Sequence, residues 1–266
     1  MVAAIDIGNT STVIGIYRKD ALLADCRLTR SVQRSKDKII AQIQSLLVKA
    51  GLNKKEIRGI GISSVVPDLT TIYRTISKTY FHLNPMIVSS KLDLGFTIHY
   101  DDPASLGSDR ICSAAAGYHK YGGPLIIIDF GTATTYNVIG SQGDFLGGVI
   151  APGIETSAIS LYRRTANLPR IAGTKLQIPE SVICTNTEQS IQAGVLRGAL
   201  DAMAGMVARI KNELPMQEAS RALVIATGGY SNRIAAQTQI IQHVEPALVL
   251  DGIRLIFDRV NNKRGI

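Results

Sequence analysis

The feature that most constrains the fold of this chain is a strand–turn–strand motif that occurs twice. The first copy, AAIDIGNTSTVIGIY, covers residues 3–17, and the second, IIIDFGTATTYNVIG, covers residues 126–140. In each copy an apolar run ends in an aspartate, a glycine follows, and hydroxyl side chains come next. A gap-free alignment pairs Asp6 with Asp129, Gly8 with Gly131, Thr12 with Thr135 and Ile16 with Ile139. A motif repeated at this distance indicates two duplicated domains.

The segments around each copy support this division. Each copy is followed by further β-branched strands and then by helical stretches, such as residues 38–51 in the first half and 187–213 in the second. We therefore predict an α/β protein with two duplicated domains, each a mixed β-sheet flanked by helices, and a cleft between them. The expected domains are residues 1–117 and 118–266.

The turn in each copy has the chemistry that polyphosphate binding requires. In residues 6–13, Gly8 lets the backbone approach a ligand, and the following N–H and hydroxyl groups can donate to phosphate oxygens. Asp6 is a candidate Mg²⁺ ligand, since Mg²⁺ in proteins takes one or two carboxylates together with phosphate and water. Asp129 and Thr132 repeat this arrangement. An ordinary hairpin turn is the alternative for either copy alone, but two copies at matched strand ends favour phosphate binding.

A third glycine motif follows a late apolar strand. The segment LVIATGGYSN, residues 223–232, runs from a strand into two consecutive glycines. Bare backbone there offers a flat surface for adenine or ribose, and a simple tight turn between strand and helix is the alternative.

Charge and composition exclude several classes of protein. The net charge of +8 is concentrated between Arg18 and Arg58, with eleven Lys/Arg against four acidic residues. No aromatic side chain interleaves these cations and no nucleic-acid-binding motif accompanies them, so we expect a solvated face or attraction of an anionic substrate, and no nucleic-acid partner. No apolar run reaches the roughly 18–20 residues of a membrane span, and no signal peptide is evident. Three widely spaced cysteines fit a reducing, cytoplasmic location.

Five motifs in order, DIGNT, GSDR, DFGTATT, GGVIAPGI and TGG, together resemble the type III pantothenate kinases. This family lies within the superfamily of acetate and sugar kinases, heat-shock chaperone ATPases and actin, and the resemblance covers nearly the whole chain. It implies ribonuclease H-like (actin-like ATPase) domains. It also implies ATP-dependent phosphorylation of the 4′-hydroxyl of pantothenate, the first step of coenzyme A biosynthesis.

The resemblance also implies roles for individual residues. The implied ATP-binding residues are Asp6, Ile7, Gly8, Asn9, Thr10, Ser11, Thr12, Val13 and Thr132. The implied pantothenate-binding residues are Tyr100, Gly107, Ser108, Asp109, Arg110 and Thr187. Asp109 falls on the general base of the family, and Asp129 on its potassium- or ammonium-binding aspartate. The usual motif is GADR, so Ser108 replaces an alanine, and Ser11 stands where asparagine is frequent.

The same resemblance implies Mg²⁺ with ATP, a monovalent cation, and a homodimer in which the partner subunit helps to close the pantothenate pocket.

The residues themselves agree with a special role for Asp109. It directly precedes RICSAAAGYHKY, so we expect it at or near a helix N-terminus, where the helix dipole favours an ionised carboxylate. A simple N-cap is the alternative. Arg110 is a candidate partner for the carboxylate of pantothenate, and an ordinary ion pair is its alternative.

Two other functions fit the same motifs. One is a kinase of another small hydroxy compound, such as a sugar, which a panel of acceptors would distinguish. The other is a non-catalytic regulator that binds nucleotide or DNA through the basic N-terminal half. The presence of Asp6, Asp109 and Asp129 argues against the regulator, because a protein without catalysis has no physical need for all three.

Overall fold

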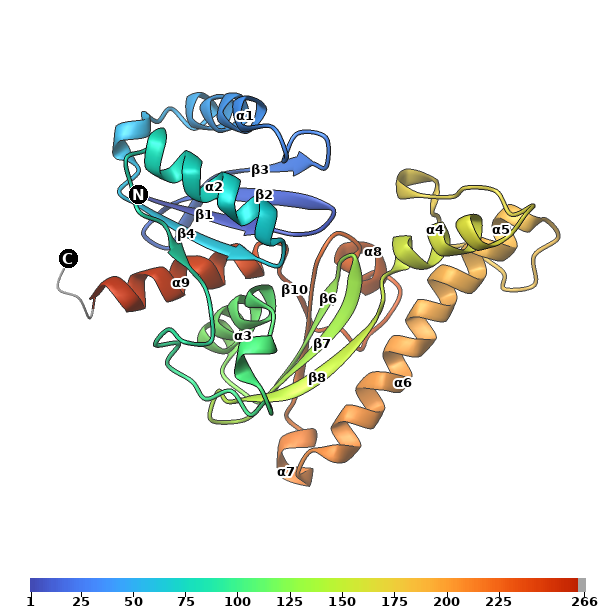
Figure 1. Ribbon diagram of the computed structural model, residues 1–266. Helices are drawn as coiled ribbons and strands as arrows, with labels where there is room; N and C mark the ends of the chain where they lie inside the picture. Colours follow the sequence, from blue (N-terminus) through green and yellow to red (C-terminus); the bar gives the residue numbers. More distant parts are fainter. Residues whose placement is uncertain (263–266) are drawn as a thin grey trace. The chain divides into compact units, whose positions relative to one another are not determined.

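A computed structural model of the chain describes residues 1–262 (Figure 1). The chain forms two compact units, and each is described by itself. Unit 1 comprises Met1–Tyr121 together with helix α9 (Leu248–Asn262), and unit 2 comprises Gly122–Pro246.

Unit 1 contains a mixed five-stranded sheet in the order β3-β2-β1-β4-β5, in which β1 is antiparallel to β2 and parallel to β4. Its strands are β1 (Val2–Ile7), β2 (Ser11–Arg18), β3 (Ala21–Thr29), β4 (Gly59–Ser64) and β5 (Met86–Ile87). Its other helices are α1 (Lys36–Lys49), α2 (Pro67–Thr79) and α3 (Ser108–Tyr121).

Unit 2 repeats this topology with a sheet in the order β8-β7-β6-β9-β10. Its strands are β6 (Leu125–Phe130), β7 (Ala133–Ile139), β8 (Phe145–Pro152), β9 (Leu223–Thr227) and β10 (His243–Val244). Its helices are α4 (Ile154–Arg164), α5 (Thr187–Gln192), α6 (Gly198–Glu213), α7 (Met216–Ala219) and α8 (Ser231–Ala235), and a π-helical segment (Ala193–Arg197) joins α5 to α6. The predicted fold of two α/β domains with mixed sheets flanked by helices is therefore confirmed.

The strand pairing corrects the gap-free alignment of the two motifs. Thr12 lies opposite Ile7 in unit 1, and the residue opposite Phe130 in unit 2 is Thr134 rather than Thr135. The second turn is thus one residue shorter, which shifts every later pair by one position. With that shift, the irregular pairing after Ile16 in β2 matches the one after Val138 in β7. The pairing of β2 with β3 and the pairing of β7 with β8 therefore share an irregularity at the same position.

The central strands are buried on both faces, which explains their nearly continuous apolar sequence. In unit 1, α1 and α2 cover one face of the sheet and α3 and α9 the other (Figure 1). β3 lies at the sheet edge and alternates between exposed and half-buried residues, as expected for a strand with one solvated face.

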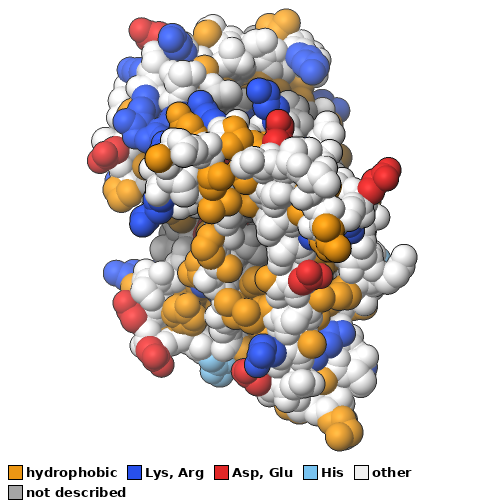
Figure 2. Space-filling view, turned by 90° about the vertical axis from the view of Figure 1, so that its right-hand side faces the viewer, with side chains coloured by type: hydrophobic (Ala, Val, Ile, Leu, Met, Phe, Trp, Pro, Cys, Tyr) orange, Lys and Arg blue, Asp and Glu red, His pale blue; other side chains and the backbone are white. Residues whose placement is uncertain are grey.

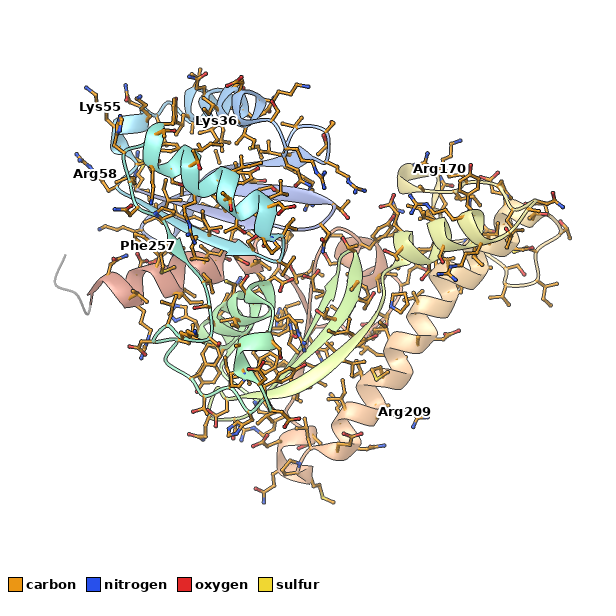
Figure 3. The ribbon with its side chains drawn as sticks, viewed as in Figure 1. Lys36, Lys55, Arg58, Arg170, Arg209 and Phe257 are labelled. Atoms are coloured by element: carbon orange, nitrogen blue, oxygen red, sulfur yellow. The ribbon has the colours of Figure 1, made fainter. Side chains whose placement is uncertain are left out.

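The position of α9 differs from the predicted division of the chain at residue 117. The sequence placed residues 118–266 in one domain, whereas α9 packs in unit 1 and α3 continues to Tyr121. Tyr17 on β2 donates to the Asp251 carboxylate at 2.6 Å, and the Phe257 ring (labelled in Figure 3) lies over Gly59 of β4. The last helix therefore completes the core of the first unit.

Among the residues that the structure describes, no helix combines the length and apolarity that a membrane crossing requires. The three cysteines all lie in this part of the chain, and each carries a free thiol.

Candidate functional site

The first phosphate-loop candidate connects β1 to β2. Within this turn, the Gly8 N–H donates to the carbonyl oxygen of Ser11 at 3.0 Å, and this bond holds the turn closed. Asn9 and Thr10 at its tip are exposed, and Asp6 at the end of β1 is half-buried. The predicted loop therefore presents two polar side chains and its backbone to solvent, with one carboxylate at its base.

Two predicted ATP-binding residues of this loop point into the core. Ile7 and Thr12 are fully buried, and the Thr12 hydroxyl donates to the Gln33 side-chain oxygen at 2.9 Å. Their side chains are therefore directed away from any ligand at the loop. Val13 and Ser11 are half-buried on β2.

The second loop connects β6 to β7. It is hydrogen-bonded to the start of α4, a segment to which the sequence analysis assigned no role. Thr132 is exposed at its tip, and its carbonyl oxygen accepts from the Gly153 N–H at 3.2 Å and the Thr156 hydroxyl at 2.6 Å. Gly153 and Thr156 begin α4, so the start of this helix fixes the loop. The GGVIAPGI motif contains Gly153, which was the available signal.

Asp129 ends β6 beside the glycine pair of the third motif. Gly228 has φ of +89°, a left-handed conformation that favours glycine. A Cβ at this position would overlap Asp129 Oδ1 and lie 2.7 Å from the Phe130 carbonyl carbon. The carboxylate therefore lies against bare backbone, in the space that a side chain at position 228 would fill.

No group of three or more His, Cys, Asp or Glu side chains suited to a metal ion occurs within residues 1–262. Mg²⁺ is commonly held by one or two carboxylates together with substrate phosphates rather than by an all-protein cage. A single carboxylate at the loop, Asp6, fits that mode.

Asp109 is the second residue of α3, close to the helix N-terminus as predicted. Its Oδ1 accepts from the Arg110 N–H at 2.8 Å. Burial raises the pKa of this carboxyl, and the Arg110 backbone N–H and guanidinium only partly offset that effect. Burial therefore opposes the effect expected at the helix end, and the net pKa of the carboxyl is raised. A raised pKa makes the carboxylate a stronger proton acceptor.

The Ser108 hydroxyl, predicted to touch substrate, is instead engaged inside unit 1. It accepts from the Ser64 N–H at 2.8 Å, lies 3.0 Å from the Ser63 hydroxyl, and donates to the Ser64 carbonyl at 3.2 Å. Ser63 is fully buried and Ser108 is 7% exposed. These bonds fasten the first turn of α3 to the end of β4 and thereby fix the backbone that carries Asp109.

Tyr100 and Arg110, both implied by the resemblance to bind pantothenate, lie in contact with each other. Arg110 Nη1 donates to the Tyr100 hydroxyl at 3.4 Å, and its guanidinium carbon lies 5.9 Å from the ring centroid. Arg110 is buried, and its positive charge acts to lower the pKa of Asp109, against the effect of burial.

The two predicted carboxylates of unit 1 both affect one buried thiol. The pKa of Cys112, on α3, is raised chiefly by burial and further by the negative charges of Asp6 and Asp109. Both carboxylates therefore lie near the same side chain. The strand pairing agrees with this, since Asp6 lies opposite Ser63 on β4 and the Ser63 hydroxyl lies 3.0 Å from that of Ser108, next to Asp109.

A cavity of about 440 Å³ adjoins this turn. Its lining combines hydroxyl groups, two apolar residues and one cation: Ser64, Val65, Pro67, Thr70, Thr71 and Arg74. Ser64 links it to the GSDR turn through the bonds to Ser108.

Thr187 belongs to unit 2, whereas the other predicted pantothenate-binding residues belong to unit 1. It is the first residue of α5 and is exposed, and Asn186 caps the helix by accepting from the Gln189 N–H at 2.9 Å.

One cation beside the first loop was not predicted. Arg27 Nη1 on β3 donates to the Ser11 hydroxyl at 2.6 Å. The two residues are sixteen positions apart, and only the pairing of β2 with β3 brings them together.

Comparison with known proteins gives a consistent family. The family model described as type III pantothenate kinase matches residues 2–209. A type III pantothenate kinase of Geobacillus kaustophilus (strain HTA426) is 41% identical over 267 residues and 100% of both chains. One from Roseiflexus sp. (strain RS-1) is 42% identical over 258 residues, covering 97% of this chain and 98% of the relative.

Solved structures of lower identity share the fold. A conserved Campylobacter jejuni protein assigned to the Baf family of transcriptional activators has a TM-score of 0.61 at 20% identity, covering 98% of this chain and 99% of its own. The activator of the 2-hydroxyisocaproyl-CoA dehydratase from Clostridium difficile, with bound ADPNP, has a TM-score of 0.58 at 14% identity, covering 99% and 97%. At these identities the likeness carries the fold and not the function.

Proposed function

The chain belongs to the type III pantothenate kinase family, and from that premise we propose that it transfers the γ-phosphoryl group of ATP to the 4′-hydroxyl of pantothenate, with Asp109 as the base. The product, 4′-phosphopantothenate, enters coenzyme A biosynthesis. The observation that carries the proposal is the position of Asp109 in the first turn of α3, which Ser108 fastens to Ser63 and Ser64 at the end of β4, beside Asp6 on β1.

We propose that ATP binds through two loops. The first comprises Asp6, Ile7, Gly8, Asn9, Thr10, Ser11, Thr12 and Val13, and the second contributes Thr132. Both lie at the carboxyl ends of matched strands, β1 and β6, which supports a common role.

Cations belong to the same proposal. Asp6 would hold Mg²⁺ together with phosphate oxygens, and Asp129 would hold K⁺ or NH₄⁺ in its bare-backbone setting. Bound there, these cations supply neutralisation of the charge that develops on the transferring phosphoryl group.

Asp109 would accept the proton of the substrate hydroxyl as its oxygen attacks the γ-phosphorus and ADP leaves. Because phosphoryl transfer has a loose transition state, holding the hydroxyl in line matters as much as removing its proton. Tyr100, Gly107, Arg110 and Thr187 would bind pantothenate, and Ser108 would act on it through the position of Asp109.

We also propose a cytoplasmic homodimer. Free cysteines fit a reducing compartment. Figure 2 shows apolar side chains exposed on one face of the molecule. In unit 2, Leu146 and Ile150 on the edge strand β8 are 40% and 64% exposed, and Tyr162 on α4 is 45% exposed. Sedimentation equilibrium measures the assembly directly.

The central experiment replaces the base. Asp109→Asn should lower kcat by about 10²–10⁴-fold, the usual contribution of a general base, while ATP binding changes little. Asp68→Asn is the matched control, since Asp68 is also the second residue of a helix, α2, but is exposed. Near-normal turnover of Asp109→Asn would remove Asp109 from this role. Assay of the unmodified enzyme with other hydroxy acceptors, each in K⁺ and in Na⁺, tests the acceptor and the cation.

A further inference from the structure

We propose that Arg27 is a further phosphate-binding residue of the ATP site, an inference that rests on the function proposed above. Arg27 lies on β3 and donates from Nη1 to the Ser11 hydroxyl, 2.6 Å away at the edge of the first phosphate loop. The side chain is therefore already directed at the loop.

Strand pairing places Arg27 in line with Asp6. Asp6 lies opposite Val13, and Val13 lies opposite Arg27, so the three form one row across β1, β2 and β3. Directly paired residues of neighbouring strands project from the same face of a sheet. With strands about 4.8 Å apart, the backbones of Asp6 and Arg27 are separated by roughly 10 Å. The carboxylate and the guanidinium therefore flank the same end of the β1–β2 hairpin.

The charge balance of the two loops calls for such a cation. Residues 6–13 contain no Lys or Arg, and neither do residues 129–135, although each stretch contributes an aspartate. A polyphosphate brought against two carboxylates needs positive charge beyond that of its own Mg²⁺. Among exposed cations of unit 1, Arg27 is bonded to the loop itself.

The guanidinium also has the capacity for a second partner. It carries five N–H donors, and the bond to Ser11 uses one. Its planar, permanently charged fork matches phosphate oxygens, which is why arginine is favoured at phosphate sites. Ser11 would then act as the support that holds Arg27 over the loop, and the pair would bind the nucleotide together.

The test compares Arg27→Gln and Arg27→Lys with the unmodified enzyme. Arg27→Gln should weaken binding of a non-hydrolysable Mg·ATP analogue by about tenfold or more, the usual effect of losing a charge-assisted hydrogen bond. Arg27→Lys keeps the charge but loses the planar guanidinium, so its affinity for the analogue should lie between those of Arg27→Gln and the unmodified enzyme. The inhibition constant of adenosine and the KM for pantothenate should stay within about twofold, because neither ligand carries the triphosphate.

Arg58→Gln is the matched control. Arg58 is an exposed arginine of the same sheet, next to the start of β4, where its N–H donates to the Met1 carbonyl, and it points away from the sheet in Figure 3. Arg58→Gln removes the same charge as Arg27→Gln, but at the end of the sheet away from the β1–β2 turn. Nucleotide binding should therefore stay unchanged.

Each result separates the two proposals. Absence of pantothenate phosphorylation in the unmodified enzyme overturns the proposed function without reference to Arg27. Wild-type affinity of Arg27→Gln for the analogue overturns the role of Arg27 alone. An equal loss for adenosine and the analogue also overturns it, since that pattern means a distorted loop rather than a lost phosphate contact.

Discussion

The contact between α9 and α3 gives the sharpest structural test, at Gly252. This glycine is buried in α9 and faces the backbone of Cys112 in α3. A Cβ added there would overlap the Cys112 carbonyl group and lie 2.7 Å from its Cα. Carbon atoms pack best at about 3.5–4.0 Å, and no side-chain rotation can relieve a clash with backbone. Gly252→Ala therefore forces the two helices apart by roughly 1 Å.

Two opposing effects set the expected magnitude. Alanine is favoured over glycine in a helix interior by about 0.8–1 kcal/mol. Overpacking a close contact costs about 1–3 kcal/mol and occasionally more, and rigid backbone on both sides places this case at the upper end. We expect Gly252→Ala to lower the free energy of unfolding by about 2 kcal/mol.

The same displacement of α3 should also lower the rate of catalysis. Asp109 lies three residues before Cys112 in α3, so it moves with the helix. A displacement of about 1 Å at a reacting group can cost on the order of 10²-fold in rate. Chemical denaturation gives the stability, and a coupled kinase assay gives kcat and KM.

Gly205→Ala is the control for helix propensity. Gly205 is exposed in α6, and nothing lies within 4 Å of an added Cβ. This variant should gain up to about 1 kcal/mol and keep its activity. If Gly252→Ala were as stable as the unmodified enzyme, with normal kcat, the reasoning about the α3–α9 contact would be refuted.

Two further predictions concern hydrogen bonding and pH. Tyr17→Phe removes the 2.6 Å bond to Asp251 that fixes α9 to β2, and should lower the free energy of unfolding by about 1.5–3 kcal/mol in urea denaturation with little change in KM. Because burial raises the pKa of Asp109 in the folded state, the folded enzyme binds this proton more tightly than the unfolded chain. The stability that this proton contributes is complete below the unfolded pKa and is lost as pH rises through the folded pKa. Asp109→Asn should therefore unfold at a higher urea concentration than the unmodified enzyme at neutral pH, and an equal or lower midpoint would contradict the burial argument.

The duplicated motif was enough to predict the fold class, because its aspartates and glycines occupy the same strand ends in both halves. It did not reveal that the second turn is one residue shorter, since Thr134 and Thr135 are both threonines. Either one preserves the apparent match with Thr12. Only the hydrogen-bonded register of β6 and β7 shows which of the two threonines corresponds to Thr12.

The amphipathic pattern of α9 predicted a helix but not its partner. The segment LVLDGIRLIFDRVNN reads as a helix from its sequence, and the helix observed there spans the same residues, Leu248–Asn262. What places it in unit 1 is the bare backbone at Gly252 and the bond from Tyr17, both of which join residues far apart in the chain. The bonds of Ser108 and Arg27 escaped prediction for the same reason.

The two matched strand ends also show how a duplicated scaffold can serve two tasks. Asp6 lies opposite Ser63 on β4, and Asp129 lies opposite Thr227 on β9, so the rows correspond. At the next position the units diverge. Unit 1 has Ser64, whose backbone is fastened to Ser108 and so to the helix that carries the proposed base.

Unit 2 has Gly228 at that position, with positive φ and no side chain. Its carbonyl accepts from the Ser231 hydroxyl at 2.7 Å, which holds the bare turn in place at the start of α8. In unit 1 the backbone at this position anchors the helix that carries the proposed base, whereas in unit 2 the glycine allows Asp129 and the Phe130 backbone to approach closely. Under the proposed function, the segments that follow these matched strands therefore have different tasks: the one in unit 1 positions Asp109, and the one in unit 2 packs against Asp129.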